Sequence, residues 1–300
     1  MGKIAAELER ALAHRKQSGR PGHPAARMLA QGHGWTVEDV VCTSGPRDRS
    51  YEEQHSTVRI AVVAAGSFQY RAPRGLRIGR ELMTPGSLLL GNPGQYFECG
   101  HEHGEGDRCI SFGYSKQYFQ TLIAGNNTDL RFDLLRLPPL QETAGLVARA
   151  FAALGGAQDA DWEDLGIALA IQVAELSAGI APRQSQPNAA AIARVTRLVR
   201  RIEHEPDAPL TVAAMARGAR LSPYHFIRAF EQVTRLTPHQ YLLRARLRAA
   251  AFRLLDEPDR ILDIALDCGF GDISNFNRAF RAEFGMSPRA YRHAANLRHT

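Results

Sequence analysis

The strongest constraint on the fold is a motif that occurs twice in the last third of this 300-residue chain. Residues 226–230 read Phe-Ile-Arg-Ala-Phe, residues 276–280 read Phe-Asn-Arg-Ala-Phe, and a proline and a tyrosine follow each copy at the same spacing. Self-similarity at a fixed period indicates a duplicated supersecondary unit. Because one copy is too small to bury much core alone, the pair predicts a two-lobed helical module.

Each copy has the pattern of two helices joined by a turn. Apolar periodicity predicts the first helices at 210–216 and 261–266, and Ser222 and Asp272 are the expected N-caps of the second helices. This arrangement is typical of a helix-turn-helix, whose second helix can enter a DNA major groove.

Glycines predict where the two turns lie. A tight interhelical turn favours glycine because glycine adopts positive φ readily, so we expect the turns at Gly218 in copy one and at Gly269 and Gly271 in copy two. From the first helix to the repeated phenylalanine the chain runs ten residues in copy one and eleven in copy two, so the second turn is one residue longer.

A single helix is predicted between the copies, over residues 241–255. The segment is rich in Leu, Ala and Arg, which are strong helix formers, and it ends before Pro258. About fifteen residues at a rise of 1.5 Å each give a rod of roughly 22 Å. Successive major-groove faces on one side of DNA lie about 34 Å apart, so tilted recognition helices at its two ends would reach both.

Residues 193–293 resemble the DNA-binding domain of AraC-type transcriptional regulators. The resemblance implies an all-α double helix-turn-helix that binds double-stranded DNA in two successive major grooves, regulates transcription and contacts RNA polymerase. Copy one departs from the family pattern at Ala219 and at Arg235, where copy two has Gly285. The matching residues in copy two are Ile264, Ala265, Gly269, Phe270, Phe276, Arg278, Phe280, Phe284, Gly285, Ser287, Pro288, Tyr291 and Arg292.

The outward face of each recognition helix carries the expected base contacts. Phe226 and Phe230, and their counterparts Phe276 and Phe280, lie at i and i+4 and should face the core. Asn pairs well with adenine and Arg with guanine, although the two recurring arginines could instead make structural ion pairs or phosphate contacts. By the resemblance, the DNA-contacting positions are Tyr224, Ile227, Arg228, Ser274, Asn275, Asn277 and Arg278.

The charge distribution favours the same partner. Residues 190–300 contain 18 Arg, no Lys and 11 acidic residues, which gives this segment a charge of +7, whereas the whole chain has +6. The basic excess therefore lies on the proposed DNA-binding module, where neutralising phosphates requires it. An Arg-rich solvated surface would explain the charge alone, but not its coincidence with the duplicated motif.

Ahead of this module the composition predicts a different domain, so the expected fold class is α+β and multidomain. Short strands at 58–71, 83–94 and 109–114 with Pro-Gly turns predict a small β-barrel, whose order resembles the cupin-like effector or dimerisation domain of AraC-type proteins. The expected boundaries are a helical extension at 1–34, the cupin-like domain at 35–138, helices at 139–181, a linker at 182–190 and the DNA-binding domain at 191–300.

Two interpretations remain open for the helical segment that follows the barrel. Its apolar stripe, which includes Leu165, Leu169, Val173 and Leu176, could pair two subunits into a homodimer, as in relatives, or could simply cover the barrel as ordinary core.

The segment from Cys99 to Cys109 concentrates metal-binding side chains. Cys99, His101, His103 and Cys109 form the predicted ligand set of a zinc-like divalent site, and Cys42, Glu52 and His55 could join them in space. The alternative is a glycine-rich loop that has a structural role or contacts an effector. If metal is bound, the protein could be a metal-binding cupin-type enzyme or a metal or redox sensor fused to a DNA-binding domain.

A catalytic function is not expected. The four cysteines lack CxxC spacing, and the chain has no phosphate-binding glycine loop and no nucleophile elbow. No apolar run approaches the roughly eighteen residues of a membrane span, so no membrane partner is expected. Few and irregularly spaced cysteines predict a reducing, cytoplasmic environment. The sequence therefore predicts a non-enzymatic regulator, and the resemblance implies control by a small-molecule effector.

Overall fold

The chain divides into two compact units, which we describe separately. One unit comprises Ile4–Ala150 and Asp161–Gln186, and the other comprises Met1–Lys3, Phe151–Ala160 and Pro187–Thr300. Most of the linker predicted at 182–190 lies outside the described residues. The computed structural model describes the ranges 3–50, 52–74, 77–123, 131–155, 161–180 and 187–296.

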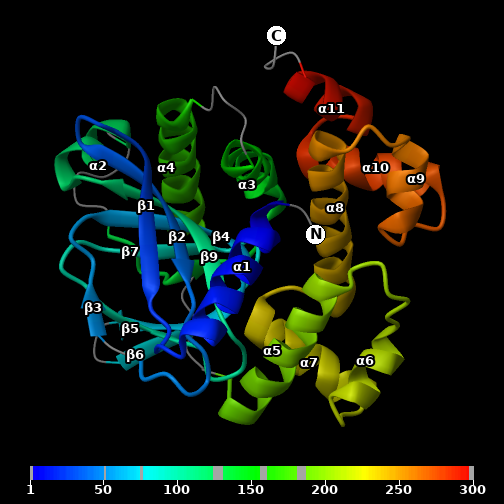
Figure 1. Ribbon diagram of the computed structural model, residues 1–300, viewed down its shortest axis with the longest axis horizontal. Helices are drawn as coiled ribbons and strands as arrows, with labels where there is room; N and C mark the ends of the chain where they lie inside the picture. The colour runs from blue at the N-terminus through cyan, green and yellow to red at the C-terminus, as the bar shows by residue number, and fades with distance from the viewer. Residues whose placement is uncertain are drawn as a thin grey trace. The chain divides into compact units, whose positions relative to one another are not determined.

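The first unit is rich in β-structure (Figure 1). Its described strands are β1 (Pro24–Gly32), β2 (Trp35–Cys42), β3 (Glu52–Gln54), β4 (Val58–Gly66), β5 (Phe68–Arg74), β6 (Arg77–Met83), β7 (Leu88–Gly91), β8 (Tyr96–Gly100), β9 (Asp107–Tyr114) and β10 (Arg136–Leu137). Its described helices are α1 (Lys3–Ser18), α2 (Lys116–Leu122), α3 (Gln141–Leu154), whose last turn falls in the other unit, and α4 (Trp162–Gly179).

These strands form two antiparallel sheets. The larger sheet has the order β1-β2-β9-β4-β7-β10, and the smaller sheet has the order β3-β8-β5-β6. The predicted small barrel therefore needs correction, because among the described strands no pairing closes one sheet onto the other. The chain crosses repeatedly between the two sheets, and one of these crossings is the loop between β8 and β9.

The core of the first unit lies between the two sheets. Ala61 and Val63 of β4 and Cys109 of β9 pack against Phe68 and Tyr70 of β5 in one buried cluster. This arrangement follows from alternation along the strands, which places every second side chain on the inner face.

Helix α4 packs on β2, a strand of the larger sheet. The Tyr114 hydroxyl of β9 donates a hydrogen bond to the carbonyl of Gly166 at 2.8 Å, and Phe112 packs against Trp162 with ring centroids 6.2 Å apart. Leu165 and Leu169 of the predicted apolar stripe are buried within this same unit. The stripe thus serves as core.

The predicted helical extension at 1–34 is helical only in its first half. Helix α1 ends at Ser18, and residues 24–32 form β1, which pairs with β2 along its whole length. Ala, Arg, Met and Leu dominate this strand and favour helices in isolation, but the hydrogen bonds of the sheet override that propensity. Sequence reasoning also missed β2, β3, β6, β8 and β10.

The second unit contains the predicted double helix-turn-helix. Its helices are α5 (Ala189–His204), α6 (Val212–Gly218), α7 (Pro223–Thr234), α8 (Pro238–Asp256), α9 (Ile261–Asp267), α10 (Ile273–Phe284) and α11 (Pro288–Asn296). The Ser222 side chain accepts a hydrogen bond from the backbone N–H of His225, and the Asp272 side chain accepts one from that of Asn275. Both predicted N-caps are confirmed, and each fixes the start of a recognition helix.

The turn of copy one differs from the prediction. Gly218 is the last residue of α6, and the residue in the left-handed region is Arg220, with φ of 54°. In copy two Gly269 takes the equivalent position with φ of 84°. The equivalence follows from the hydrogen bonds that close the two helices, Leu221 N–H to Ala216 O and Phe270 N–H to Ala265 O. The extra residue of copy two is therefore Gly271.

A second left-handed position recurs at the end of each recognition helix. Arg235 caps α7 with φ of 68°, and Gly285 caps α10 with φ of 74°. Glycine tolerates this conformation, whereas a side chain such as that of Arg235 costs roughly 1 kcal/mol there. The first helix-turn-helix thus carries strain at both of its turns that the second avoids.

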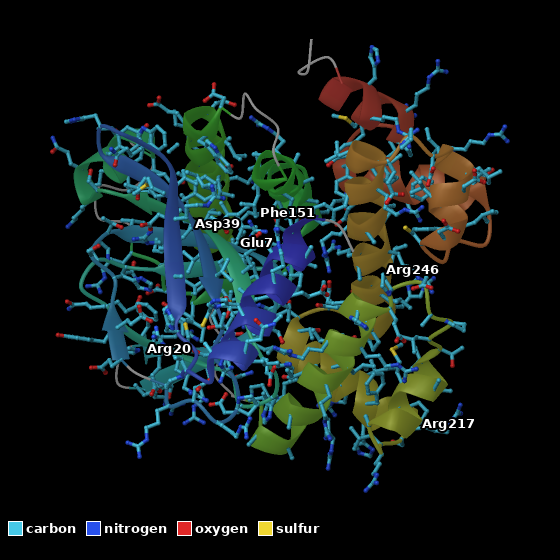
Figure 2. All side chains as sticks on the ribbon, in the orientation of Figure 1. Glu7, Arg20, Asp39, Phe151, Arg217 and Arg246 are labelled. Carbon is cyan, nitrogen blue, oxygen red and sulfur yellow. The ribbon has the colours of Figure 1, made fainter. Side chains whose placement is uncertain are left out.

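Helix α8 is the rod between the copies, and it is longer than predicted. Its 19 residues correspond to about 28 Å at 1.5 Å per residue. Arg246, labelled in Figure 2, donates hydrogen bonds to the carbonyls of Pro206 and Ala208 and lies against Gly269, where a Cβ would meet its guanidinium at 2.9 Å. This contact and the positive φ both require glycine there.

Acidic partners hold the other arginines of α8. Arg244 pairs with Glu283 of α10 at 3.2 Å, and Arg248 pairs with Glu203 of α5 at 2.6 Å. Arg253 pairs with Asp267 of α9 at 2.9 Å. The rod is thus tied by charge to helices on both sides. None of the described helices combines the length and apolarity that crossing a membrane requires.

Candidate functional site

The recognition helices α7 and α10 each bury one face and expose the other. Phe226, Phe230, Phe276 and Phe280 are at most 1% exposed, as their i, i+4 spacing predicted. Their burial orients the opposite face of each helix toward solvent. Six of the seven predicted DNA-contacting residues are exposed, and the seventh, Ile227, is half-buried.

On α7, an aromatic ring holds the arginine. Tyr224 is 63% exposed, and its hydroxyl accepts a hydrogen bond from Nη1 of Arg228 at 3.1 Å. The guanidinium also lies 5.7 Å from the centre of the Tyr224 ring. This contact holds the Arg228 guanidinium against the Tyr224 ring on the exposed face of the helix.

On α10, an amide holds the corresponding arginine. Nη2 of Arg278 donates to Oδ1 of Asn275 at 3.1 Å, and both residues are exposed together with Ser274 and Asn277. The face therefore offers two amides, a hydroxyl and a guanidinium, a set that can donate and accept hydrogen bonds at base edges. Arg278 makes no ion pair among the described residues, unlike Arg244, Arg248 and Arg253 of α8.

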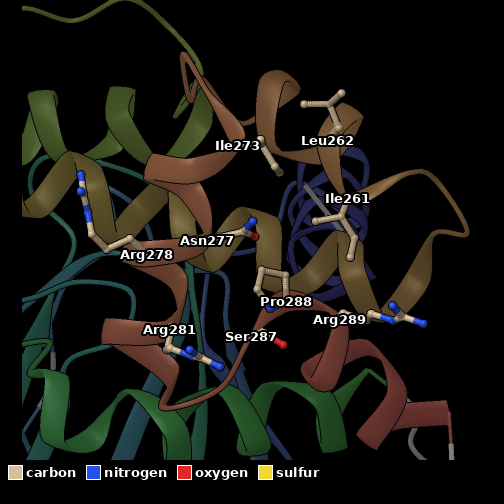
Figure 3. A pocket seen from close by; sticks show the side chains of 9 residues that line it. All are labelled: Ile261, Leu262, Ile273, Asn277, Arg278, Arg281, Ser287, Pro288 and Arg289. Carbon is tan, nitrogen blue, oxygen red and sulfur yellow. The ribbon is translucent and has the colours of Figure 1, made fainter.

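A hollow of about 600 Å³ adjoins this face and is shown in Figure 3. Asn277 and Arg278 of α10 both line it. Arg281, one turn after Asn277, also lines the hollow and is exposed. Sequence reasoning missed Arg281, although its i, i+4 spacing from Asn277 places both residues on one stripe of the helix. The remaining lining residues come from α9, from the start of α10 and from the start of α11: Ile261, Leu262, Ile273, Ser287, Pro288 and Arg289.

The first unit contains a partly open cavity of about 320 Å³. Residues of both sheets line it: Cys42 of β2 and Cys109 of β9 belong to the larger sheet, and Cys99 of β8 belongs to the smaller sheet. The loop between β8 and β9 contributes His101. Thiols, an imidazole and carboxylates thus meet in one cavity.

Three of these groups lie close enough to share one ion. The ligand atoms of Cys42, His101 and Asp107 are all within 4.8 Å of one another, and the three residues are buried. Nε2 of His101 lies 2.6 Å from Oδ1 of Asp107, and the Cys109 thiol donates to Oδ2 of the same carboxylate at 3.4 Å. The cluster shares His101 with the ligand set predicted from the sequence. It contains Cys42 and Asp107 in place of the predicted Cys99, His103 and Cys109.

The pairing of the strands explains why the cluster differs from the predicted ligand set. Cys42 joins because it is the direct partner of Asp107 across β2 and β9. His103, a predicted ligand, is outside the cluster and half-buried in the loop. His55 bonds to the Tyr70 hydroxyl at 2.8 Å and stacks on Phe97 instead.

Burial and charge set the protonation of the cavity groups. Burial lowers the pKa of His101, but its interactions with Asp107 and Cys42 outweigh burial and raise the pKa to about 9. Burial, then the Asp107 charge, raises the pKa of both the Cys99 and the Cys109 thiols well above the usual value. Burial, helped by the charge of Arg59, lowers the pKa of His55 to about 3.

Known proteins resemble the second unit. Residues 215–294 match the family model described as a helix-turn-helix domain. The regulatory protein SoxS of Salmonella typhimurium is 35% identical over 96 residues, which cover 32% of this chain and 90% of SoxS. The transcriptional activator RhaS of Escherichia fergusonii is 38% identical over 100 residues, but these cover only 33% of this chain and 36% of RhaS.

One solved structure completes the comparison. An AraC-type transcriptional regulator from Chromobacterium violaceum is 29% identical, with a TM-score of 0.34 over 36% of this chain and 96% of the other.

Proposed function

The chain belongs to the AraC family of helix-turn-helix transcriptional regulators, and we propose that it contacts two successive major grooves of its DNA site with α7 and α10. One observation carries this proposal: both helices bury their phenylalanines and expose polar and basic residues on the opposite face. The length of α8, about 28 Å at 1.5 Å per residue, suits helices that tilt toward grooves about 34 Å apart.

The two helices differ in the chemistry they offer to DNA. On α10, Asn275, Asn277 and Arg278 can form the bidentate pairs that distinguish adenine and guanine. On α7, Tyr224 and Ile227 offer apolar surface that suits thymine methyl groups. We therefore assign most of the hydrogen-bonded base reading to α10, and a larger share of the positioning to α7.

Arg281 supports a second role for α10. It lies one turn further along the helix than Asn277 and lines the same hollow as Arg289 of α11. Two guanidinium groups at the edge of the reading surface suit the phosphates that flank a groove. Phosphate contacts from these positions would fix the register of α10 on the duplex.

The cavity of the first unit supports control by an effector. A partly open space of about 320 Å³, lined by apolar, polar and charged side chains, can accommodate a small ligand. We assign the effector-binding role to this unit, as the resemblance to the cupin-like effector domain of AraC-type proteins implies. Dimerisation and contact with RNA polymerase stay expectations from the family resemblance.

Selection of binding sites from random DNA with the full chain tests the DNA-binding function. We expect an enriched site with two blocks of preferred bases about one helical turn apart. A matched selection with Asn277→Ala should lose preference within one block only. Enrichment of no sequence by the full chain, or a single uninterrupted block, would contradict the two-groove arrangement.

A further inference from the structure

We propose that the cavity of the first unit binds a divalent metal ion of intermediate softness, represented by zinc, through Cys42, His101 and Asp107. The three side chains come from parts of the chain that are up to 65 residues apart, and the sheets bring their ligand atoms within 4.8 Å of one another.

The topology explains how the ligands meet. Cys42 at the end of β2 and Asp107 at the start of β9 are direct partners in an antiparallel pair, so their side chains project to the same face of the larger sheet. His101 follows β8 of the smaller sheet and begins the loop that crosses to β9. An ion at this point would join the two sheets where the chain passes between them.

The distances suit an ion with little rearrangement. Zinc binds nitrogen and oxygen at about 2.0–2.2 Å and sulfur at about 2.3 Å, so tetrahedral ligand atoms are separated by roughly 3.3–3.8 Å. The present limit of 4.8 Å lies about 1 Å above this range, a difference that side-chain rotations can cover. The 2.6 Å between His101 and Asp107 joins Nε2 to Oδ1 and is their hydrogen bond, which leaves Nδ1 of His101 as the nitrogen available to the ion.

The imidazole provides an independent indication of a ligand. Nδ1 of His101 is buried and has no hydrogen-bond partner of normal geometry in the described part of the chain. Its side chain is only 1% exposed, so solvent does not satisfy this nitrogen in place of a protein group. An orphaned buried polar atom is costly and calls for a partner. A ligand in the adjoining cavity supplies one.

The donor set selects the kind of ion. A thiolate and an imidazole disfavour magnesium and calcium, which prefer oxygen ligands, and a carboxylate suits zinc better than copper(I). The Cys109 thiol, 3.4 Å from Oδ2 of Asp107, is placed to become a fourth ligand. Coordination displaces protons from the His101 ring and from each thiol that binds, and these protons leave to solvent.

Binding of the ion does not depend on the DNA-binding function, but its regulatory meaning does. If the ion is the signal, it acts on the unit that we proposed to receive an effector. A chain that binds the ion but no DNA would refute only the proposed function. A chain that binds DNA but no ion would refute only this inference.

Metal analysis of the full chain tests the site. The reduced protein is incubated with excess zinc chloride, dialysed without chelator and analysed for zinc. We expect about one zinc per chain in the wild type and in His103→Ala, and loss of most of it in His101→Ala and Cys42→Ala. His103 is the matched control because it lies two residues away and was predicted as a ligand from the sequence, but is outside the cluster.

Cobalt(II) provides a readout that does not require the variants to fold. Cobalt bound to the wild-type chain should give the charge-transfer absorption of a thiolate-bound ion, and excess zinc should abolish it. A wild-type chain that retains less than about a tenth of an equivalent of zinc overturns the inference. So does bound cobalt without a thiolate band, or equal zinc in wild type and a folded His101→Ala variant.

Discussion

Arg108 holds Asp39 by two hydrogen bonds of 2.8 Å, one from Nε and one from Nη2, to the two oxygens of the carboxylate. Both residues are at most 4% exposed, and Nη1 of Arg108 also donates to the carbonyl of Ile4 in α1. One buried guanidinium thus ties β2, β9 and the N-terminal helix together. Because a charge that loses its partner inside a protein is costly, this pair should control the acid stability of the first unit.

Asp39→Asn should destabilise the first unit by about 3–5 kcal/mol at neutral pH, because it leaves Arg108 buried without its counter-charge. Burial raises the pKa of Asp39, but hydrogen bonds and charge from Arg108 and Arg27 outweigh burial and hold it below the usual value. The group is therefore ionised in the folded state at a pH where it is protonated in the unfolded chain. Its stabilisation is complete above about pH 4 and is lost as pH falls through the lower folded-state pKa.

The fluorescence of Trp35 and Trp162 follows the unfolding of the first unit alone, because both tryptophans of the chain lie in that unit. Urea unfolding followed by tryptophan fluorescence should show a large difference in the free energy of unfolding between wild type and Asp39→Asn at pH 7. The difference should narrow at acidic pH, where the wild type loses the same interaction. A difference independent of pH would mean that the ion pair is not its cause.

Arg235→Gly should stabilise the second unit by about 1 kcal/mol, because it relieves a side chain from the left-handed conformation. The matched variant is Gly285→Ala, which should destabilise by a similar amount at the equivalent position of copy two. Far-ultraviolet circular dichroism follows the helices of this unit during unfolding. Equal signs for the two variants would refute the equivalence of the two caps.

Arg278→Ala and Asn277→Ala should each weaken specific DNA binding by about 1–3 kcal/mol and relax the preference at one base pair. Neither should change the melting temperature, since both side chains are exposed. Arg201→Ala, on the exposed side of α5, is a control for the loss of one positive charge. If Arg278→Ala melts earlier and binds all sequences equally poorly, the residue is structural instead.

The fragment 187–300 should keep specific DNA binding. It carries helices α5–α11 of the second unit and the basic excess of the chain. Affinity should fall steeply with salt, since each neutralised phosphate contributes a slope of about −0.9 to the logarithmic plot. Fragment and full chain should share one slope. A fragment that binds no site at low salt, when the full chain does, would show that the unit is insufficient.

The sequence predicted the helical unit better than the β-rich one for a physical reason. Turns, caps and phenylalanine spacing are local, so Ser222, Asp272 and Phe276 could be assigned from their neighbours alone. Strand pairing is not local, and β1 has the composition of a helix.

Non-local pairing also limited the prediction of the cavity cluster. Residue 42 meets residue 107 only through the register of β2 and β9, so the predicted ligands clustered along the sequence instead. The residue that takes positive φ in the first turn is Arg220, two positions after the predicted Gly218. An arginine gives no signal for that conformation, whereas a glycine does.

The ion pairs of α8 change how genetic data on this regulator should be interpreted. Glu203 lies on α5 and Glu283 on α10, and each forms an ion pair with an arginine of α8, the helix between the two helix-turn-helix units. Changing either glutamate frees a cation and loosens the spacing of α7 and α10, although neither glutamate faces a base. A screen for loss of promoter recognition should therefore recover substitutions of these acidic residues. Such positions would mark ion pairs inside the protein rather than residues that contact the operator.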